Sequence, residues 1–351
     1  MKVFITGGAG FIGSHAAAFY ARRGEEVIAF DNFSRSKLLG YPEIHSKQNF
    51  DYLSQFSNVE RIMGDILDVE TLRTHIKDAD LVIHTAAQTA VTASLKDPVT
   101  DFSTNALGTL NVLEAVRFQP KPPAVIFCST NKVYGDNVNL ISLKENKTRY
   151  EFDGPSFQSG INETFNIDLC GHTPYGCSKL SADLYMQDYA HRHGLKIGVF
   201  RLSCIYGPRQ FGVEDQGWLA WFTIATHTSR PIYFYGNGKQ TRDVLFISDL
   251  LEAFHAFELN GSHGVFNLGG GVKNTLSLVE LVALLEKLTG KKSQLQYAPW
   301  RPDDQKVYIS DIGKAKAVLG WSPKVSIEEG VAKLIEWVKE NEHIFSENLL
   351  L

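Results

Sequence analysis

The chain has 351 residues, of which 44% are hydrophobic and 21% charged, the balance of an ordinary globular protein with room for one extended domain or two. Its net charge of −4 provides no basic field, so the sequence predicts neither nucleic acid nor an anionic membrane as a partner. No apolar run has the length of a transmembrane helix, and a strand pattern starts directly after Met1, so we expect a cytoplasmic protein without a signal peptide. The four cysteines form no CxxC pair and no metal-like spacing with histidine, and we expect free thiols and no metal site.

The first half of the chain alternates short apolar runs with helical patterns. The alternation predicts an α/β fold, a Rossmann-type doubly wound parallel sheet with helices on both faces. In chain order, strands are expected at Lys2–Thr6, Glu26–Phe30, Val59–Met63, Leu81–His84, Ala124–Cys128 and Ile197–Arg201. Helices are expected at Phe11–Arg23, Val69–Ile76, Asp101–Phe118 and Tyr175–His193.

The rest of the chain is less regular. Val138–Thr173 mixes Asn, Glu, Gly and Pro, which predicts a long loop or lid beside the site. After Pro208 the alternation loosens, and helices near Leu276–Leu288 and Ile327–Asn341 predict a smaller C-terminal substrate-binding region. We therefore expect a dinucleotide-binding core at 1–174 with the lid-like loop, a core helix and strand at 175–205, and a smaller region, mainly 206–351, interleaved with the core.

A glycine-rich turn follows the first predicted strand and opens the first predicted helix. Gly7, Gly10 and Gly13 have the three-residue spacing of a phosphate-binding turn, in which close backbone approach tolerates no Cβ and the helix N-terminus offers amides to a pyrophosphate. Asp31 ends the second strand, where a carboxylate can accept both ribose hydroxyls and repel a 2′-phosphate. This favours NAD over NADP, although Arg35 lies close enough in sequence to keep NADP open.

Tyr175 and Lys179 are four residues apart at the start of a predicted helix, so they share one face and their tips can meet around a ligand. A phenol titrates near 10, but an ammonium group and a positive nicotinamide ring would each favour the phenolate and lower its pKa. Such a pair alone would more often be a surface pair. Thr130 changes that expectation, because it follows a core strand at the edge where these sheets bind ligands.

Taken together, these features resemble the extended short-chain dehydrogenase/reductase superfamily, in its sugar-nucleotide epimerase and dehydratase branch. The residues that carry the resemblance over essentially the whole chain are the three glycines, Asp31, His84-Thr85-Ala86-Ala87, Asn105, Thr130 and Tyr175-x-x-x-Lys179. The resemblance implies that Tyr175 is the base, that Lys179 holds the nicotinamide ribose, that Thr130 positions the sugar hydroxyl, and that Asn105 orders the lysine. The cofactor-binding residues expected from pattern and resemblance are Gly7, Gly10, Phe11, Ile12, Gly13, Asp31, Asn32, Arg35, Asp65, Ile66, Ala86, Ala87, Tyr175 and Lys179.

The resemblance extends to two later segments, 236–243 and 301–304, whose arginines clamp the substrate diphosphate in the family. Arginine suits that role because its planar fork matches phosphate oxygens. The expected substrate-binding residues are Thr130, Asn131, Arg209, Gln210, Arg242, Arg301 and Asp304. Cys204 departs from the branch, because many relatives carry an asparagine there that contacts the diphosphate.

The reaction type is narrowed by the two residues after Thr130. Dehydratases of the branch carry an acidic pair there, because elimination of water needs a proton donor and an acceptor. This chain has Asn131 and Lys132 instead, so 4,6-dehydration is not expected. The expected reaction is epimerisation with transient oxidation by NAD. The segments around Thr130, Tyr175 and Arg209 are most similar to the subgroup that inverts carbon 2 of a CDP-linked hexose, with CDP-paratose and CDP-tyvelose as the expected pair and CDP-glucose and CDP-mannose as the alternative pair.

Two other functions stay open. One is a UDP-sugar 4-epimerase, and the other is a non-catalytic NAD-binding sensor, although such sensors usually lose the tyrosine or the lysine. The resemblance also implies a homodimer, because the helices near Asp101–Phe118 and Tyr175–His193 form the dimer interface in the family.

Overall fold

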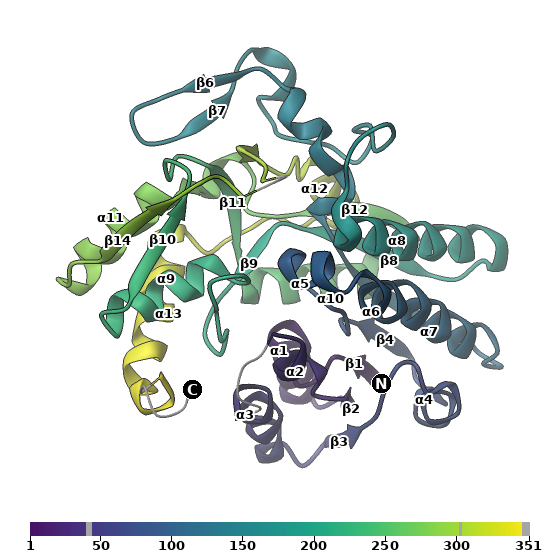
Figure 1. Ribbon diagram of the computed structural model, residues 1–351. Coiled ribbons are helices and arrows are strands. Elements are labelled where there is room, and N and C mark those ends of the chain that lie inside the picture. Colours follow the sequence, from purple (N-terminus) through teal and green to yellow (C-terminus); the bar gives the residue numbers. More distant parts are fainter. Residues whose placement is uncertain (40–43, 302–303, 346–351) are drawn as a thin grey trace. The chain divides into compact units, whose positions relative to one another are not determined.

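A computed structural model describes residues 1–39, 44–301 and 304–345 of the chain (Figure 1). The described residues form two compact units that interleave along the sequence. The first unit consists of Met1–Val133, Thr173–Arg201 and Leu251–Phe266, and the second of Tyr134–His172, Leu202–Leu250 and the described part of Asn267–Leu351. Within the described residues, no helix combines the length and apolar character needed to cross a membrane.

A seven-stranded sheet is built mainly from the first unit. In spatial order its strands are β12 (Gly264–Leu268), β8 (Ile197–Leu202), β5 (Ala124–Thr130), β4 (Leu81–His84), β1 (Lys2–Thr6), β2 (Glu26–Asp31) and β3 (Val59–Met63). The pairs from β5 to β3 are all parallel. The strand order reverses between β1 and β4, which is the topological switch point where Rossmann sheets bind their ligands. The Rossmann-type fold expected from the sequence is confirmed.

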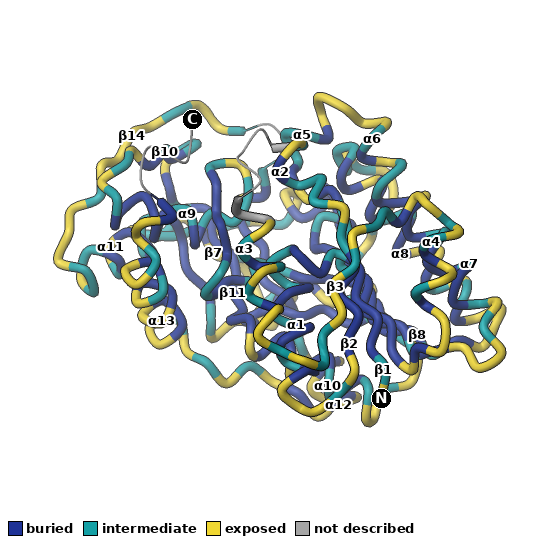
Figure 2. Tube along the Cα trace, turned by 90° about the horizontal axis from the view of Figure 1, so that it is seen from below, coloured by how far each residue is buried: buried dark blue, intermediate teal, exposed yellow. Residues whose placement is uncertain are grey.

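Most of these strands are buried on both faces because their sequences are almost continuously apolar, whereas the edge strand β3 is mainly exposed. Side chains such as Phe4 and Phe127 belong to one large core that the strands share with three helices. Phe200 packs on the opposite face, against Phe254 and Phe257 of α10 (Ile247–Asn260). The first core includes α4 (Val69–Ile76), α7 (Gly108–Arg117) and α8 (Thr173–His193). Figure 2 shows the consequence, with central strands such as β1, β2 and β8 dark blue and the outer faces of the helices yellow.

The remaining helices of the first unit are α1 (Phe11–Arg22), α2 (Ser34–Leu39), α3 (Ile44–Tyr52), α5 (Val91–Lys96) and α6 (Pro98–Phe102). The predicted helix at Asp101–Phe118 is interrupted, because a π-helical segment at Ser103–Leu107 joins α6 to α7. π-Helical turns of this kind are rare and often occur at functional sites. In Figure 1, α7 and α8 run side by side on the right of the view, and they are in contact.

The second unit is made of small sheets and helices. Its strands are β6 (Leu143–Glu145), β7 (Tyr150–Phe152), β9 (Cys204–Tyr206), β10 (Pro231–Tyr235), β11 (Thr241–Phe246), β13 (Thr275–Ser277), β14 (Gln294–Ala298) and β15 (Val307–Tyr308). Its helices are α9 (Trp218–His227), α11 (Leu278–Thr289), α12 (Gly313–Leu319) and α13 (Ile327–Glu340). β11 is the central strand of a four-stranded sheet, because β9, β13 and β15 all pair with it.

The segment 138–173 differs from the sequence-based expectation of a loop, because it contains the antiparallel hairpin β6–β7. Tyr150 explains why the hairpin forms: its ring packs with Val307 and Ile309, and its backbone N–H donates to the Lys239 carbonyl. Strands of three residues leave no visible alternation in a sequence, so only their packing reveals them.

A buried ion pair attaches α8 to the sheet. The two nitrogens Nε and Nη2 of Arg201 donate to the Asp183 carboxylate at 3.0 and 3.1 Å, and the side chains are 4% and 0% exposed. Ser129 on β5 donates to the same carboxylate at 2.6 Å, and Gln187 donates to it at 2.6 Å. Because every bond to this buried charge comes from β5, β8 or α8 itself, the pair fixes the helix against the sheet.

We expect Asp183→Ala to lower the free energy of unfolding by about 3–5 kcal/mol, since it leaves the Arg201 guanidinium buried without its counter-charge. The matched control is Asp188→Ala on the same helix, which removes an exposed ion pair with Arg192 and should cost less than about 1 kcal/mol. Urea denaturation followed by circular dichroism compares the two variants. Equal losses in both would contradict the role given to the buried pair.

Candidate active site

The glycine turn after β1 has the geometry of a phosphate cradle. Gly7 adopts φ +71°, and a Cβ on Gly13 would lie only 2.1 Å from the Gly7 carbonyl oxygen, so neither position accepts a side chain. Gly10 is the N-cap residue of α1, and no side chain in the described part of the chain caps this helix. The first-turn amides of Phe11, Ile12 and Gly13 are therefore left to an anionic ligand, as a dinucleotide pyrophosphate requires.

Asp31 lies at the end of β2 beside this turn. Its carboxylate accepts the Ala9 amide at 3.0 Å and the Phe33 amide at 2.7 Å, one on each oxygen. A carboxylate offers about four lone-pair sites, so capacity for two ribose hydroxyls is left. Burial raises the pKa of the Asp31 carboxyl, and the hydrogen bonds from Phe33 and Ala9 oppose that rise.

The other residues expected to bind the cofactor follow the neighbouring strands. Asn32 donates to the Asp65 carboxylate at 2.9 Å, which joins the ends of β2 and β3. Ile66 is buried, and its side chain packs where a Cβ on Gly108 would clash, so this side chain belongs to the core. Arg35 lies in α2, and Ala86 and Ala87 follow β4, where the Ala86 amide donates to the Thr6 hydroxyl at 3.3 Å. The carboxyl ends of parallel strands lie at the same edge of a sheet. The residues expected to bind the cofactor therefore lie along that edge, which includes the switch point between β1 and β4.

The three residues expected at the reacting centre are buried together in the first unit. The Thr130 hydroxyl lies close enough to the Tyr175 phenol to lower its pKa, and both side chains are buried. Lys179 donates to the Cys128 carbonyl at 2.7 Å, and its Nζ lies 4.2 Å from the centre of the Phe127 ring. Asn131 follows Thr130 in the sequence, and its Oδ1 lies 3.4 Å from the Thr130 hydroxyl. The hydroxyl, the phenol and the ammonium are therefore all buried in this part of the first unit.

The electrostatics of the pair differ from the sequence-based expectation. Burial raises the pKa of Tyr175 to about 12, and only the hydrogen bond with Thr130 opposes it. Burial lowers the pKa of Lys179 to about 8, against the opposing charges of Cys128, Asp183 and Asp101. In the protein alone, desolvation therefore outweighs any help that the ammonium gives the phenolate, and a further positive charge is needed to make Tyr175 a base near neutral pH.

Asn105 lies in the π-helical segment and is part of a closed polar network. It donates to Ser178 Oγ at 2.9 Å and to Asp101 Oδ1 at 3.2 Å, and it accepts the Gln88 amide at 2.8 Å. Gln88 in turn donates to Asp101 at 2.8 Å. The sequence analysis did not identify Gln88, Asp101 or Ser178. The available signal was the i, i+4 spacing of Asp101 and Asn105, together with the position of Ser178 directly before Lys179.

His84 is another residue whose place the sequence alone did not explain. Its two ring nitrogens meet the hydroxyls of Thr6 at 2.7 Å and Thr109 at 2.9 Å, and its ring stacks on Phe127. Burial, helped by the nearby positive charge of Lys179, lowers the pKa of His84 to about 3. His84 therefore stays neutral and adds no positive charge to the centre.

The other expected substrate-binding residues all belong to the second unit. Arg242 forms an ion pair with Asp304 at 2.8 Å and donates to the Thr241 carbonyl. Arg301 pairs with Asp215 at 2.9 Å and lies 4.0 Å from the centre of the Tyr235 ring. Pro302 and Asp303 of the same motif lie outside the described residues.

Arg209 and Gln210 follow β9 in a strained turn. Arg209 adopts φ +62°, a conformation that costs a non-glycine residue energy and is found more often at functional sites than elsewhere. Gln210 is buried and donates to the Ile205 carbonyl at 3.0 Å, but its Oε1 has no hydrogen-bond partner in the described structure. A buried acceptor of this kind is ready for a donor from a ligand.

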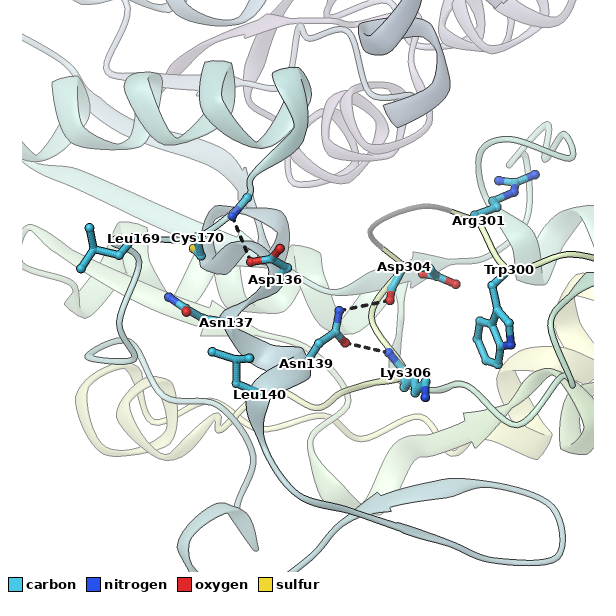
Figure 3. Close-up of a pocket in the computed structure, with 11 residues that line it drawn as sticks. Asp136, Asn137, Asn139, Leu140, Leu169, Cys170, Trp300, Arg301, Asp304 and Lys306 are labelled. Carbon is cyan, nitrogen blue, oxygen red and sulfur yellow. Dashed lines mark hydrogen bonds between the residues drawn. The ribbon is translucent and has the colours of Figure 1, made fainter.

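A cavity of about 710 Å³ opens within the second unit, and Arg301 and Asp304 are among its lining residues (Figure 3). In this view Arg301 and Trp300 lie at one end, and Leu140 and Leu169 at the other. Asn139 connects two other lining residues, because its side chain donates to the Asp304 carbonyl and accepts the Lys306 backbone N–H, each at 3.2 Å. The size falls within the range usual for small-molecule sites.

Cys204 makes a contact that fits its departure from the family pattern. The indole N–H of Trp218 donates to the Cys204 sulfur at 3.3 Å. The thiol thus accepts a hydrogen bond here.

The sequence comparisons agree with this geometry. The model of the GDP-mannose 4,6 dehydratase family matches residues 4–334. The CDP-paratose 2-epimerase of Salmonella typhi is 41% identical over 96% of this chain and 99% of its own length. The UDP-glucuronate 4-epimerase of Thermodesulfobacterium geofontis is 32% identical over 96% of both chains.

A solved structure is similar along the same length. The UDP-glucuronic acid 4-epimerase of Bacillus cereus, in complex with UDP-glucuronic acid and NAD, superposes with a TM-score of 0.81 and 28% identity, covering 97% of this chain and 99% of that chain. Because the family model spans nearly all of the two units that hold the glycine turn, the buried Thr130–Tyr175–Lys179 centre and the arginines, the chain belongs to the GDP-mannose 4,6 dehydratase family.

Proposed function

We propose that this chain is an NAD-dependent sugar-nucleotide epimerase that inverts carbon 2 of a CDP-linked hexose, with CDP-paratose and CDP-tyvelose as its pair. The observation that carries the proposal is the buried grouping of Thr130, Tyr175 and Lys179 in a chain that is 41% identical to a CDP-paratose 2-epimerase over almost its full length. The choice of CDP over UDP rests on that similarity.

The proposed chemistry assigns each side chain a separate task. NAD held at the glycine turn would supply the hydride chemistry, oxidation of the sugar carbon followed by reduction from its other face. Tyr175 takes the hydroxyl proton, and Thr130 holds the oxygen that loses it. Lys179, which has a positive charge below its pKa of about 8, orients the ribose and favours the phenolate.

The residues that follow Thr130 support epimerisation over dehydration within this family. Elimination of water needs a proton donor and an acceptor at carbons beyond the oxidised one, and Asn131 and Lys132 provide no carboxylate for that task. Arg209, Gln210, Arg242, Arg301 and Asp304 are proposed to hold the nucleotide diphosphate and its ribose. Arg242 and Asp304 are ion-paired in this structure, so binding by this pair would exchange one charge contact for another.

A UDP-sugar 4-epimerase is the second candidate, favoured by the 32% identity with a UDP-glucuronate 4-epimerase. The decisive experiment incubates the protein with CDP-paratose, CDP-glucose, UDP-glucose and UDP-glucuronic acid, and follows the sugar ring protons by NMR. Change at C2 of a CDP-sugar supports the proposal, and change at C4 of a UDP-sugar replaces it with the second candidate. No change with any of the four would remove both.

Tyr175→Phe should lower turnover by about 10²–10⁴-fold while bound NAD is retained, because only the proton acceptor is lost. The control is Tyr189→Phe on the same helix, whose hydroxyl donates to Glu114 at 2.5 Å and lies outside the site. Turnover by NMR and cofactor content after denaturation are measured for both variants. An NAD-binding sensor would respond to neither change.

Asp31→Asn should weaken NAD binding by about ten- to a hundredfold, since hydrogen bonds from the ribose hydroxyls to a charged acceptor are lost, and it should narrow the preference over NADP. Calorimetric titration with each cofactor provides the ratio. Asp68→Asn, at the exposed N-cap of α4, is the control and should leave both affinities unchanged. An unchanged NAD-to-NADP ratio in the Asp31 variant would argue against the ribose contact.

We also propose a homodimer formed through α6 to α8. Five large apolar side chains of this contiguous surface are exposed: Val99, Phe102, Leu107, Leu184 and Tyr185. Exposed apolar groups gathered in this way usually mark a protein interface.

The double variant Phe102→Glu with Leu184→Glu should convert a dimer into a monomer, because each substitution places a charge where an apolar contact of about 1.5–3 kcal/mol is expected. Light scattering after size-exclusion chromatography measures the mass. Leu259→Glu, at an exposed position of α10, is the control and should leave the dimer intact. A wild-type chain that elutes as a monomer would refute the proposed assembly.

A further inference from the structure

The first turn of α8 carries Tyr175, and two buried side chains from the preceding helical segment hold it in place. Neither Ser94 on α5 nor Asp101 on α6 belongs to the expected site, and both are almost completely buried. Ser94 contacts the backbone of Tyr175, and Asp101 contacts Ser178, which directly precedes Lys179.

Ser94 holds the backbone of Tyr175 itself. Its Oγ accepts the Tyr175 N–H at 3.1 Å and donates to the Val91 carbonyl at 2.7 Å. The first backbone N–H groups of a helix have no partner within the helix. Pro174, directly before Tyr175, has no backbone N–H group. Ser94 therefore satisfies the amide that a helix start would otherwise leave buried and unpaired, and it does so at the reacting residue.

The residue that begins this helix is strained. Thr173 adopts φ +57°, which is unfavourable for a β-branched side chain, and its hydroxyl accepts the Gly176 amide at 3.3 Å. A strained helix start stays in place only where neighbouring contacts hold it. The bond from Ser94 to Tyr175 is one such contact.

Asp101 holds the same turn through a side chain. Its Oδ2 accepts the Ser178 hydroxyl at 2.5 Å, and its Oδ1 accepts Gln88 at 2.8 Å and Asn105 at 3.2 Å. Ser178 is three residues after Tyr175, so it lies on the same side of the helix, about 60° around the axis from Tyr175. A carboxylate that fixes Ser178 also fixes the rotation of α8 about its axis, and hence the direction of both reacting side chains.

We infer that Ser94 and Asp101 are positioning residues for the epimerisation centre, Ser94 through the Tyr175 amide and Asp101 through Ser178. The inference rests on the proposed function. Asp101 has a second effect, because its negative charge raises the pKa values of both Tyr175 and Lys179. The other groups that face this pair are Thr130 and Cys128 from β5, Asp183 from α8 and the neutral His84 from β4.

Removal of the Asp101 charge should move both pKa values in one direction. Asp101→Asn keeps the size and one acceptor oxygen, so Ser178 retains a partner, but the negative charge is gone. Both pKa values should then fall, so the acid limb, set by Tyr175, and the alkaline limb, set by Lys179, should both shift by roughly one unit toward lower pH. A loss of packing alone would lower the rate at every pH without moving either limb.

The matched control is Asp249→Asn, which removes another buried carboxylate that accepts two backbone amides. Its stability should fall in the same way, while both limbs of its pH profile stay in place. If the profile of Asp101→Asn has the wild-type limbs after correction for stability, the electrostatic part of the inference is overturned.

Ser94→Ala tests the other contact. Loss of the acceptor lets Tyr175 drift, so kcat should fall by about ten- to a hundredfold while KM changes less than about twofold. Ser94→Thr restores a hydroxyl and should recover most of kcat. A kcat within twofold of wild type in Ser94→Ala, or equal loss in both variants, would overturn the positioning role.

Failure of the proposed function would look different. If the wild-type protein epimerises no sugar nucleotide, the NAD-bound protein can still be titrated by tyrosinate absorbance, with Tyr175→Phe subtracted to isolate Tyr175. A lower Tyr175 pKa in Asp101→Asn than in wild type would support the coupling even then, and an unchanged value would refute it.

Discussion

The structure depends on one constraint, that a polar stripe of α8 must be buried against the sheet and the neighbouring helices with every group satisfied. Tyr175, Ser178, Lys179 and Asp183 lie on one face of this helix, and all are buried. Each has a dedicated partner: the Thr130 hydroxyl, the Asp101 carboxylate, the Cys128 carbonyl and the Arg201 guanidinium. Because a buried polar group without a partner costs more than a hydrogen bond returns, these contacts define a single position for the helix.

The same burial sets the direction of the pKa shifts of Tyr175 and Lys179 in the protein alone. Desolvation disfavours any charged form, so it raises the pKa of Tyr175 and lowers that of Lys179 at the same time. The two shifts favour the neutral phenol of Tyr175, and they weaken the protonated form of Lys179. In the proposed function, a positive charge brought by the cofactor would favour the Tyr175 phenolate. The overall charge of the chain contributes nothing here, and the local arrangement contributes everything.

Relatives in this family carry different reactions on one scaffold, and the structure indicates where the differences lie. In the proposed function, the glycine turn, Asp31 and the Tyr175–Lys179 pair serve the cofactor and the hydride step. Asn131 and Lys132, directly after Thr130, are where elimination would need carboxylates. Cys204, which accepts a hydrogen bond from Trp218, alters a position that contacts the diphosphate in many relatives.

Sequence periodicity determined most of the first unit. The strands Lys2–Thr6, Val59–Met63 and Leu81–His84 and the helix Val69–Ile76 have the expected bounds. The alternation of strand patterns with helical patterns is a local signal, which the chain itself carries. The glycine spacing and the four-residue separation of Tyr175 and Lys179 were likewise readable along the chain.

Only the tertiary structure decided the rest. The hairpin β6–β7 depends on the packing of Tyr150 against Val307 and Ile309, more than 150 residues away. The contacts of Ser94 and Asp101 with α8 join residues separated by 81 and 77 positions. The pKa of Tyr175 followed burial and not its neighbour Lys179. A sequence records which residues are four apart, but desolvation and pairing depend on what surrounds them after the chain has folded.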